Sequence, residues 1–141
     1  MSKRGSIILV EDDADDKFIV EEILQELKIP NQLKWFTSCP DAFVYLKTMT
    51  EQPFIIFCDV NLPGQSGIEF KREIDADPEL RKKSIPFVFM STSADQRFVN
   101  EVYTEMTVQG FFQKDFSYDE MKRMFSVIMD YWKICKHPNV S

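Results

Sequence analysis

Three short apolar runs constrain the fold of this chain more than any other feature of its sequence. They are Ile7–Val10, Phe54–Cys58 and Phe87–Met90, and they are apolar at nearly every position instead of alternating with polar residues. Strands with this pattern are covered on both faces, as in a parallel sheet that carries helices on each side. Two weaker runs, Leu33–Phe36 and Gly110–Gln113, complete a set of five expected strands, and a lysine inside the former indicates an edge strand.

Helix-like segments separate these runs, with apolar residues at helical spacing. The expected helices are Asp15–Leu27, Asp41–Lys47, Ile68–Ala76, Arg97–Met106 and Tyr118–Lys136. A strand–helix unit repeated five times predicts an α/β domain with right-handed crossovers. We expect a flavodoxin-like (βα)5 fold, with a five-stranded parallel sheet of order 2-1-3-4-5 and helices on both faces. Residues 1–141 form a single domain in this prediction, with a core of about 6–136 and a short C-terminal tail.

Composition narrows the classes of function. The 141 residues include 23 Asp and Glu against 17 Lys and Arg, which argues against a nucleic-acid partner because phosphate backbones attract clustered basic residues. No apolar run approaches the roughly 20 residues needed to cross a bilayer, and the N-terminus lacks a signal-peptide pattern. Three cysteines without C-x-x-C spacing indicate neither a disulfide framework nor a zinc site. We therefore expect a cytoplasmic protein that binds neither nucleic acid nor membrane.

Polar residues directly follow four of the expected strands. Glu11 and Asp12 follow the first strand, Asp59 the third, Ser91 the fourth and Lys114 the fifth. Ligands of open parallel sheets bind beyond the carboxyl ends of the strands, and the first and third strands are neighbours in the expected order. Three carboxylates would therefore converge in one pocket, beside a hydroxyl and an ammonium. Clustered carboxylates repel one another unless a cation compensates, so the arrangement indicates a binding site.

The types of ligand indicate Mg²⁺ as that cation. All are oxygens, and Mg²⁺ is usually held by one or two carboxylates together with waters and a phosphate oxygen. An aspartate beside Mg²⁺ and a lysine is a nucleophile suited to accept a phosphoryl group. Each motif alone has a simpler explanation, because acidic residues and serines also favour helix N-termini. Their coincidence at adjacent strand ends favours phosphoryl chemistry.

Four motifs resemble the signature of response-regulator receiver domains in two-component signalling. They are Val10-Glu11-Asp12-Asp13, the segment from Asp59 to Gly67, Ser91-Thr92-Ser93, and Lys114. They occur at matching strand ends and in matching order, and the resemblance extends from Ile7 to about Lys136. It implies a role for each residue of the acidic pocket. Asp59 would be the phosphoacceptor and a metal ligand, Asp12 would coordinate Mg²⁺ directly, Glu11 would act through water, and Asn61 would supply its backbone carbonyl.

The resemblance also implies residues that respond to the phosphoryl group. Ser91 would donate a hydrogen bond to it, Lys114 would pair with it, and Phe111 matches an aromatic residue that turns inward. The strand-end count favours Ser91 for the hydroxyl role, whereas counting back from Lys114 favours Thr92. Asp115 stands where the family usually has a proline with a cis bond. A cis bond before a non-proline residue costs about 3 kcal/mol, so either local contacts hold it or the loop is rearranged.

The residues and the resemblance together predict a single-domain response regulator that is not an enzyme, apart from promoting its own phosphorylation and dephosphorylation. A histidine kinase or a histidine phosphotransfer protein would phosphorylate Asp59. The signal would reach an unknown downstream protein through a surface made by Arg97–Met106, Gly110–Gln113 and Tyr118–Lys136.

Two alternatives remain beside this prediction. One is a Mg²⁺-dependent phosphatase of the haloacid dehalogenase type, which needs Asp-x-Asp. Asn61 stands in place of the second aspartate, and an amide cannot act as its general acid. The other is a pseudo-receiver that binds partners without phosphorylation, against which the intact acidic residues argue.

A second apolar stripe runs along the last expected helix. Val127, Tyr131 and Ile134 recur at i, i+4 and i+7 beside the core stripe. A helix that lies on a sheet buries one stripe. The second is therefore either ordinary scattered exposure or an interface with a partner or with a second copy, and we expect a homodimer contact through these three residues. The ending Asp130-Tyr131-Trp132 is also similar to stand-alone regulators that accompany phytochrome-type histidine kinases.

Overall fold

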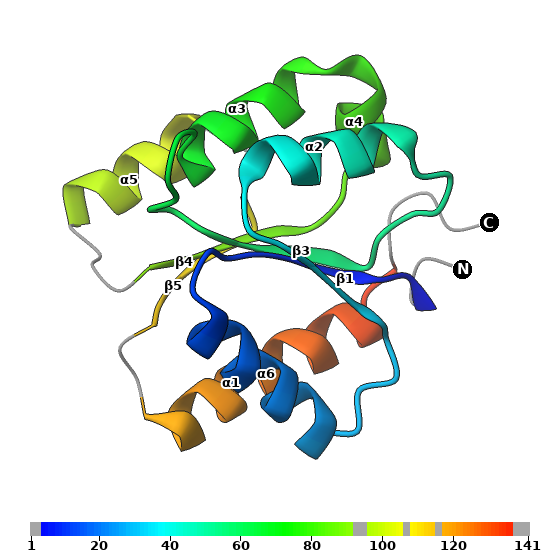
Figure 1. Ribbon diagram of the computed structural model, residues 1–141, viewed down its shortest axis with the longest axis vertical. Coiled ribbons are helices and arrows are strands. Elements are labelled where there is room, and N and C mark those ends of the chain that lie inside the picture. The colour runs from blue at the N-terminus through cyan, green and yellow to red at the C-terminus, as the bar shows by residue number, and fades with distance from the viewer. Residues whose placement is uncertain (1–3, 92–95, 106–107, 115–116, 137–141) are drawn as a thin grey trace.

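The computed structural model describes residues 4–91, 96–105, 108–114 and 117–136, which form a parallel sheet flanked by helices (Figure 1). The strands are β1 (Ile7–Val10), β2 (Leu33–Phe36), β3 (Ile55–Asp59), β4 (Phe87–Ser91) and β5 (Gly110–Gln113). All neighbouring strands pair in parallel, in the order β2-β1-β3-β4-β5. The expected flavodoxin-like fold and strand order are confirmed.

Helices cover both faces of the sheet. They are α1 (Ala14–Glu26), α2 (Cys39–Thr48), α3 (Gly67–Ala76), α4 (Pro78–Lys83), α5 (Gln96–Glu105) and α6 (Tyr118–Ile134). Helices α1 and α6 lie on one face, and α2 to α5 lie on the other (Figure 1).

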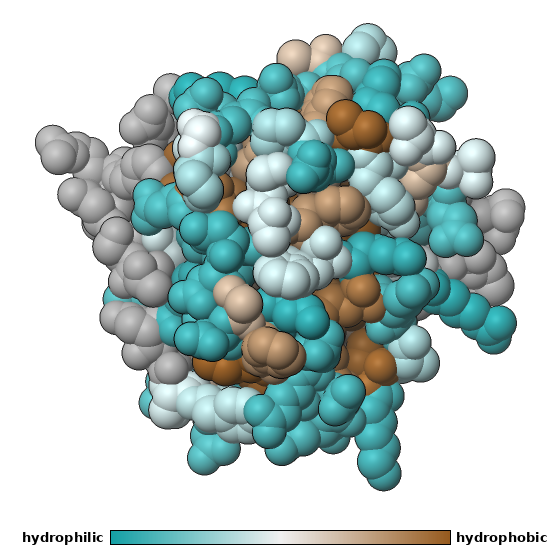
Figure 2. Space-filling model, viewed as in Figure 1, coloured by the Kyte–Doolittle hydropathy of each residue, from teal (hydrophilic) through white to brown (hydrophobic). Residues whose placement is uncertain are grey.

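The side of the molecule seen in Figure 2 is largely hydrophilic, with apolar residues visible in scattered patches. In the part of the chain that the structure describes, no helix has the length and apolarity needed to cross a bilayer.

Each face of the sheet has its own apolar core, because successive strand side chains point to opposite faces. On the α1–α6 side, Phe57 meets Phe125 with ring centroids 4.8 Å apart. On the other side, the ring of Phe87 lies 6.1 Å from that of Phe70 and 5.0 Å from that of Phe89. Strands β1, β3 and β4 are buried at every position. This two-sided burial explains why they show as continuous apolar runs in the sequence.

The element boundaries agree with the predicted ones to within two residues, and two of the shifts concern candidate functional residues. Strand β3 includes Asp59 and β4 includes Ser91, so both belong to the sheet and not to the loops that follow it. The register pairs Asp59 with Met90 and Ser91 with Gln113. The sheet therefore fixes the backbones of both polar residues.

Helix α4 is an element that the sequence analysis did not predict. It has six residues, and Asp77 caps it by accepting a hydrogen bond of 3.1 Å from a first-turn N–H. Pro78 occupies the first turn, where no hydrogen-bonded N–H is needed. Lys83 at its end donates hydrogen bonds of 3.3 Å to the carbonyl oxygens of Leu46 and Met49. Pro78, which in the sequence indicates the end of α3, thus also starts α4. The hydrogen bonds of Lys83 join α4 to the end of α2.

Gly67 brings the start of α3 against the end of β3. Its N–H donates to the carbonyl of Val60 at 2.9 Å. A Cβ atom at this position would clash with the carbonyl oxygen of Asp59 and lie 3.1 Å from the sulfur of Cys58. Only glycine permits this approach, so the backbone of Asp59 is packed directly under α3.

We expect Gly67→Ala to lower the free energy of unfolding by about 2–3 kcal/mol, because the added methyl group forces the β3–α3 junction apart. Urea denaturation measures the loss. Gly64→Ala is the matched control, because Gly64 has a φ of 80° but open space around its Cβ position. We expect this substitution to lower the free energy of unfolding by about 1 kcal/mol, which is the conformational cost of alanine at a positive φ. Equal losses in the two variants would contradict the packing argument.

Candidate functional site

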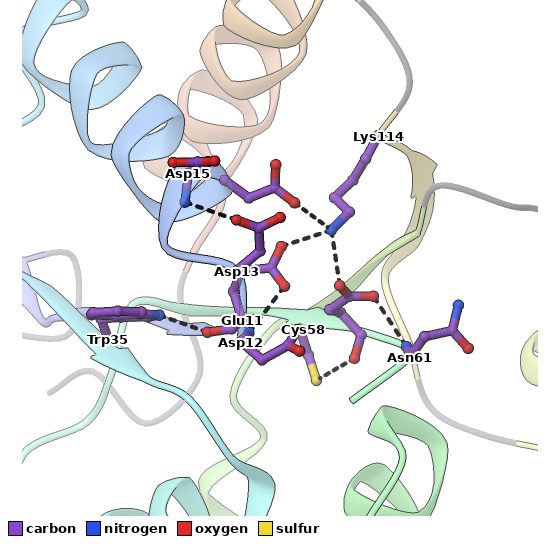
Figure 3. A network of polar contacts seen from close by, with 10 residues as sticks. Glu11, Asp12, Asp13, Asp15, Trp35, Cys58, Asn61 and Lys114 are labelled. Atoms are coloured by element: carbon purple, nitrogen blue, oxygen red, sulfur yellow. Dashed lines mark hydrogen bonds and ion pairs between the residues drawn. The ribbon is translucent and has the colours of Figure 1, made fainter. Parts of the chain in front are cut away.

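The candidate functional side chains meet at the carboxyl ends of β1, β3 and β5. Glu11 follows β1, Asp59 ends β3 and Lys114 follows β5. The backbone N–H of Lys114 donates to the carbonyl of Ser91 at 2.7 Å, which fixes the lysine beside β4. From there its side chain extends toward the end of β1 (Figure 3).

One backbone and one side-chain contact from β2 hold the segment after β1. The N–H of Glu11 donates to the carbonyl of Phe36 at 3.0 Å, and the indole N–H of Trp35 donates to the carbonyl of Glu11 at 2.7 Å (Figure 3). The carboxylate of Glu11 accepts a hydrogen bond of 3.1 Å from the N–H of Asp12. Asp13 then caps α1. Hydrogen bonds therefore hold the backbone of the acidic residues in place at the carboxyl ends of the strands.

Glu11, Asp12 and Asp59 form a cluster of carboxylates. One oxygen of each lies within 4.8 Å of the others. Glu11 and Asp59 are buried, whereas Asp12 is exposed, so the cluster is open to solvent on one side. A donor set of oxygens alone, with room for water, fits a hard divalent cation such as Mg²⁺ and lacks the nitrogen or sulfur ligands typical of zinc.

The Lys114 ammonium lies at the centre of an ion-pair network. It is 2.6 Å from Glu11 Oε1, 2.8 Å from Asp59 Oδ2 and 2.9 Å from Asp16 Oδ2. Burial disfavours the charged ammonium, but the three carboxylates outweigh it and raise the pKa of Lys114 above its ordinary value. Lys114 is therefore a fixed positive charge that joins β5 to β1, β3 and α1.

Asp16 is a member of this network that the sequence analysis did not identify. It lies in the first turn of α1. Burial opposes ionisation, but hydrogen bonds with Lys114 and Glu11 lower the pKa of Asp16 below its ordinary value. A signal was available in the acidic run of residues 11–16, because a helix that begins just after β1 presents its first turn to the same edge of the sheet.

Glu11 has the most perturbed carboxyl of the network. Burial raises its pKa most, and the neighbouring Asp59 carboxylate raises it further, whereas the hydrogen bond from Lys114 lowers it. The net effect raises the pKa of Glu11 from 4.5 to about 9. Ionisation of Glu11 is therefore disfavoured unless a cation compensates the cluster beyond what Lys114 supplies.

Asn61 and Phe111 are two further residues singled out in the sequence, of which Asn61 lies at this edge and Phe111 lies within β5. The N–H of Asn61 donates to Asp59 Oδ1 at 3.0 Å, while its side chain is exposed (Figure 3). Phe111 is half-buried, with its ring centroid 5.9 Å from that of Phe89. Thr92 and Asp115 lie outside the described residues, so the alternative hydroxyl and the bond after Lys114 stay predictions.

Fold and site together define the class of protein. The family model of the response regulator receiver domain matches residues 7–126. The chain belongs to this family, whose members are signalling modules of two-component systems and are not generally classed as enzymes.

Its relatives include regulators from phytochrome signalling. The chain is 30% identical over 131 residues to response regulator Rcp1 of Synechocystis, covering 89% of this chain and 87% of that protein. The solved structure of the phosphorylated cyanobacterial phytochrome response regulator RcpA matches with a TM-score of 0.84 and 25% identity, over 97% of this chain and 99% of that one. The Mn²⁺-bound form of Rcp1 matches with a TM-score of 0.81 and 28% identity, over 95% and 99% of the respective chains. The expected similarity to phytochrome-associated regulators is confirmed.

The raised pKa of Glu11 predicts how stability depends on pH without metal. The unfolded chain releases this proton near pH 4.5 and the folded chain near pH 9, so stability falls as the pH rises through that window. We expect Glu11→Gln to raise the free energy of unfolding at pH 8 by about 1–2 kcal/mol, with a smaller gain at pH 5. Urea denaturation in EDTA at several pH values measures this.

Glu22→Gln provides the control for that experiment, because Glu22 is an exposed carboxyl on α1 away from the network. It should change stability little and equally at both pH values. A loss of stability in Glu11→Gln at pH 8, or a gain of the same size at pH 5, would contradict the assignment.

Proposed function

We propose that Asp59 accepts a phosphoryl group from a histidine kinase or a histidine phosphotransfer protein. The observation that carries the proposal is that the Asp59 carboxylate lies 2.8 Å from the Lys114 ammonium while sharing a cluster with Glu11 and Asp12. Phosphoryl transfer depends on positioning and on neutralising the charge of the transferring oxygens. A carboxylate between a fixed cation and a metal-compatible cluster meets both requirements.

Asp59 is better placed as the nucleophile than the other two carboxylates of the cluster. It is the last residue of a buried central strand, and the N–H of Asn61 orients one of its oxygens. Asp12 is exposed beyond the strand end, and burial raises the pKa of Glu11, which disfavours its ionised form. Strand β3 and the Asn61 N–H thus hold the Asp59 carboxylate in a fixed orientation within the cluster.

The proposed reaction exchanges one bond to phosphorus for another. A carboxylate oxygen of Asp59 attacks the phosphorus of a phosphohistidine, the P–N bond breaks as the P–O bond forms, and the imidazole leaves with the electron pair. The Lys114 ammonium balances charge on the transferring oxygens. When bound, Mg²⁺ supplies further charge neutralisation and orients the phosphoryl group. The groups that would hold it are the carboxylates of Glu11, Asp12 and Asp59 and the backbone carbonyl of Asn61.

The response to phosphorylation would pass through β4 and β5. Ser91 follows the β4 residue that pairs with Asp59, which supports it as the hydroxyl that donates to the proposed phosphoryl group. Phe111, on the adjoining strand β5, packs against Phe89. A hydrogen bond from Ser91 to the phosphoryl group would let Phe111 repack, and the surface of α5, β5 and α6 would change. A downstream protein would bind that altered surface.

We expect incubation with Mg²⁺ and acetyl phosphate to add one phosphoryl group to the protein, measured by intact mass. Asp59→Asn should abolish the adduct because the amide is not a competent acceptor, and EDTA should abolish it in the unchanged protein. Asp130→Asn is the matched control: this exposed aspartate on α6 is remote from the network, and its variant should be phosphorylated normally.

Each other outcome favours a different function. Turnover of acetyl phosphate without an adduct would favour a phosphatase, although Asn61 and the family membership of the chain argue against one. Neither adduct nor turnover would favour a pseudo-receiver. An adduct that persists in Asp59→Asn would show that another residue is the acceptor.

We also propose that the second apolar stripe on α6 is a homodimer contact. Val127, Tyr131 and Ile134 are 61%, 57% and 84% exposed, which is unusual for three neighbouring apolar side chains on one helix face. The stripe borders a cavity of about 330 Å³ that Phe112 and Trp132 also line. A second copy placed there would cover part of the surface that phosphorylation is proposed to alter.

Two valines with the same exposure allow a matched test of the dimer. Val127 on α6 and Val44 on α2 are both 61% exposed. We expect Val127→Asp to weaken self-association at least about tenfold, because a charge would be buried at the contact, while Val44→Asp has no effect. Analytical ultracentrifugation with and without a phosphodonor measures this. A monomer under all conditions, or equal effects of the two substitutions, would contradict the proposal.

A further inference from the structure

Asp16 contacts the functional lysine but does not belong to the carboxylate cluster. Its Oδ2 lies 2.9 Å from the Lys114 ammonium. The three carboxylates that are close enough together to share a cation are Glu11, Asp12 and Asp59. Asp16 therefore contacts the lysine without being one of the carboxylates that could share the cation.

The donors of Lys114 are limited. An ammonium has three N–H donors, and the three carboxylate contacts at 2.6 to 2.9 Å account for them. Lys114 can therefore offer a phosphoryl group only the donor that Asp59 now accepts, unless it also releases another carboxylate. Any phosphoryl group attached at Asp59 enters this competition.

Phosphorylation and metal binding would affect the three carboxylate contacts of Lys114 differently. Phosphorylation converts the Asp59 carboxylate itself into an acyl phosphate, so that contact passes to the phosphoryl oxygens. Glu11 belongs to the cluster that a divalent cation would neutralise. Asp16 alone among the three is altered by neither event, so its contact of 2.9 Å with the ammonium is the one left to compete with the phosphoryl group.

We propose that Asp16 is a positioning residue that competes with the phosphoryl group for Lys114, and so weakens the binding of that group at Asp59. The inference rests on the proposed function of Asp59 as the phosphoacceptor. The side chain of Asp16 is 33% exposed, against 2% for Glu11 and 10% for Asp59. Asp16 therefore has a solvent-facing side and holds the lysine without enclosing it, so the exchange between partners is reversible.

Beryllofluoride, which mimics a phosphoryl group on a carboxylate, tests the inference as a binding measurement. Trp35 is a built-in reporter, because its indole N–H donates to the carbonyl of Glu11 at 2.7 Å. A Trp132→Phe background leaves it as the single tryptophan, since the sequence has two. We expect Asp16→Asn to bind beryllofluoride in Mg²⁺ about five- to tenfold more tightly than the parent, because a competing charge is removed at short range.

Two further variants separate competition from general effects of charge or folding. Asp15→Asn removes the same charge from the adjacent residue, which is exposed, and should change the affinity less than about twofold at physiological salt. Asp16→Glu restores a carboxylate and should return the affinity close to that of the parent. Urea denaturation in EDTA confirms that each variant is folded, and this measurement does not depend on phosphoryl chemistry.

The outcomes distinguish the inference from the function on which it rests. If the parent binds beryllofluoride but Asp16→Asn binds it equally or more weakly, Asp16 does not compete and this inference alone is overturned. The same holds if Asp15→Asn tightens binding as much as Asp16→Asn does. If the parent shows neither beryllofluoride binding nor an acetyl phosphate adduct, the proposed function is overturned and the inference with it.

Discussion

The rest of the site depends on the ion pairs of one ammonium group. Strands β1 and β3 and helix α1 bring the carboxylates of Glu11, Asp59 and Asp16 to one edge of the sheet, where burial makes their mutual repulsion costly. Lys114 offsets that repulsion from the far side of β4. The same contacts tie β5, a short strand at the edge of the sheet, to the central strands. The ion pairs of Lys114 therefore both compensate the charge of the carboxylates and hold the elements of the site together.

Much of the fold could be predicted because burial leaves a direct trace in the sequence. Ile7–Val10 and Gly110–Gln113 were bounded correctly, and continuous apolarity identified the central strands as covered on both sides. The strand-end rule then brought Glu11, Asp59 and Lys114 together without any knowledge of distances. These inferences succeed because a parallel sheet aligns all its carboxyl ends at one edge.

Other features depend on geometry that no local pattern specifies. Helix α4 is too short to show helical periodicity, and Asp77 and Pro78 look in the sequence like the end of α3 alone. Asp16 could not be told from its acidic neighbours until the phase of α1 was known. The clash that makes Gly67 necessary involves the carbonyl of Asp59, eight positions away along the chain. In each case the sequence does not indicate which atoms of different helices and strands come into contact.

Asp77 has a consequence for the direction in which a signal can travel. One of its oxygens caps α4, the other accepts a hydrogen bond of 2.9 Å from Lys47 of α2, and its N–H closes the last turn of α3. A single residue thus fastens three helices into one block, which Lys83 braces again. A displacement at Asp59 would meet this block on one face of the sheet. The proposed response through β4 and β5 toward α6 would therefore start beside three helices that are fastened to one another.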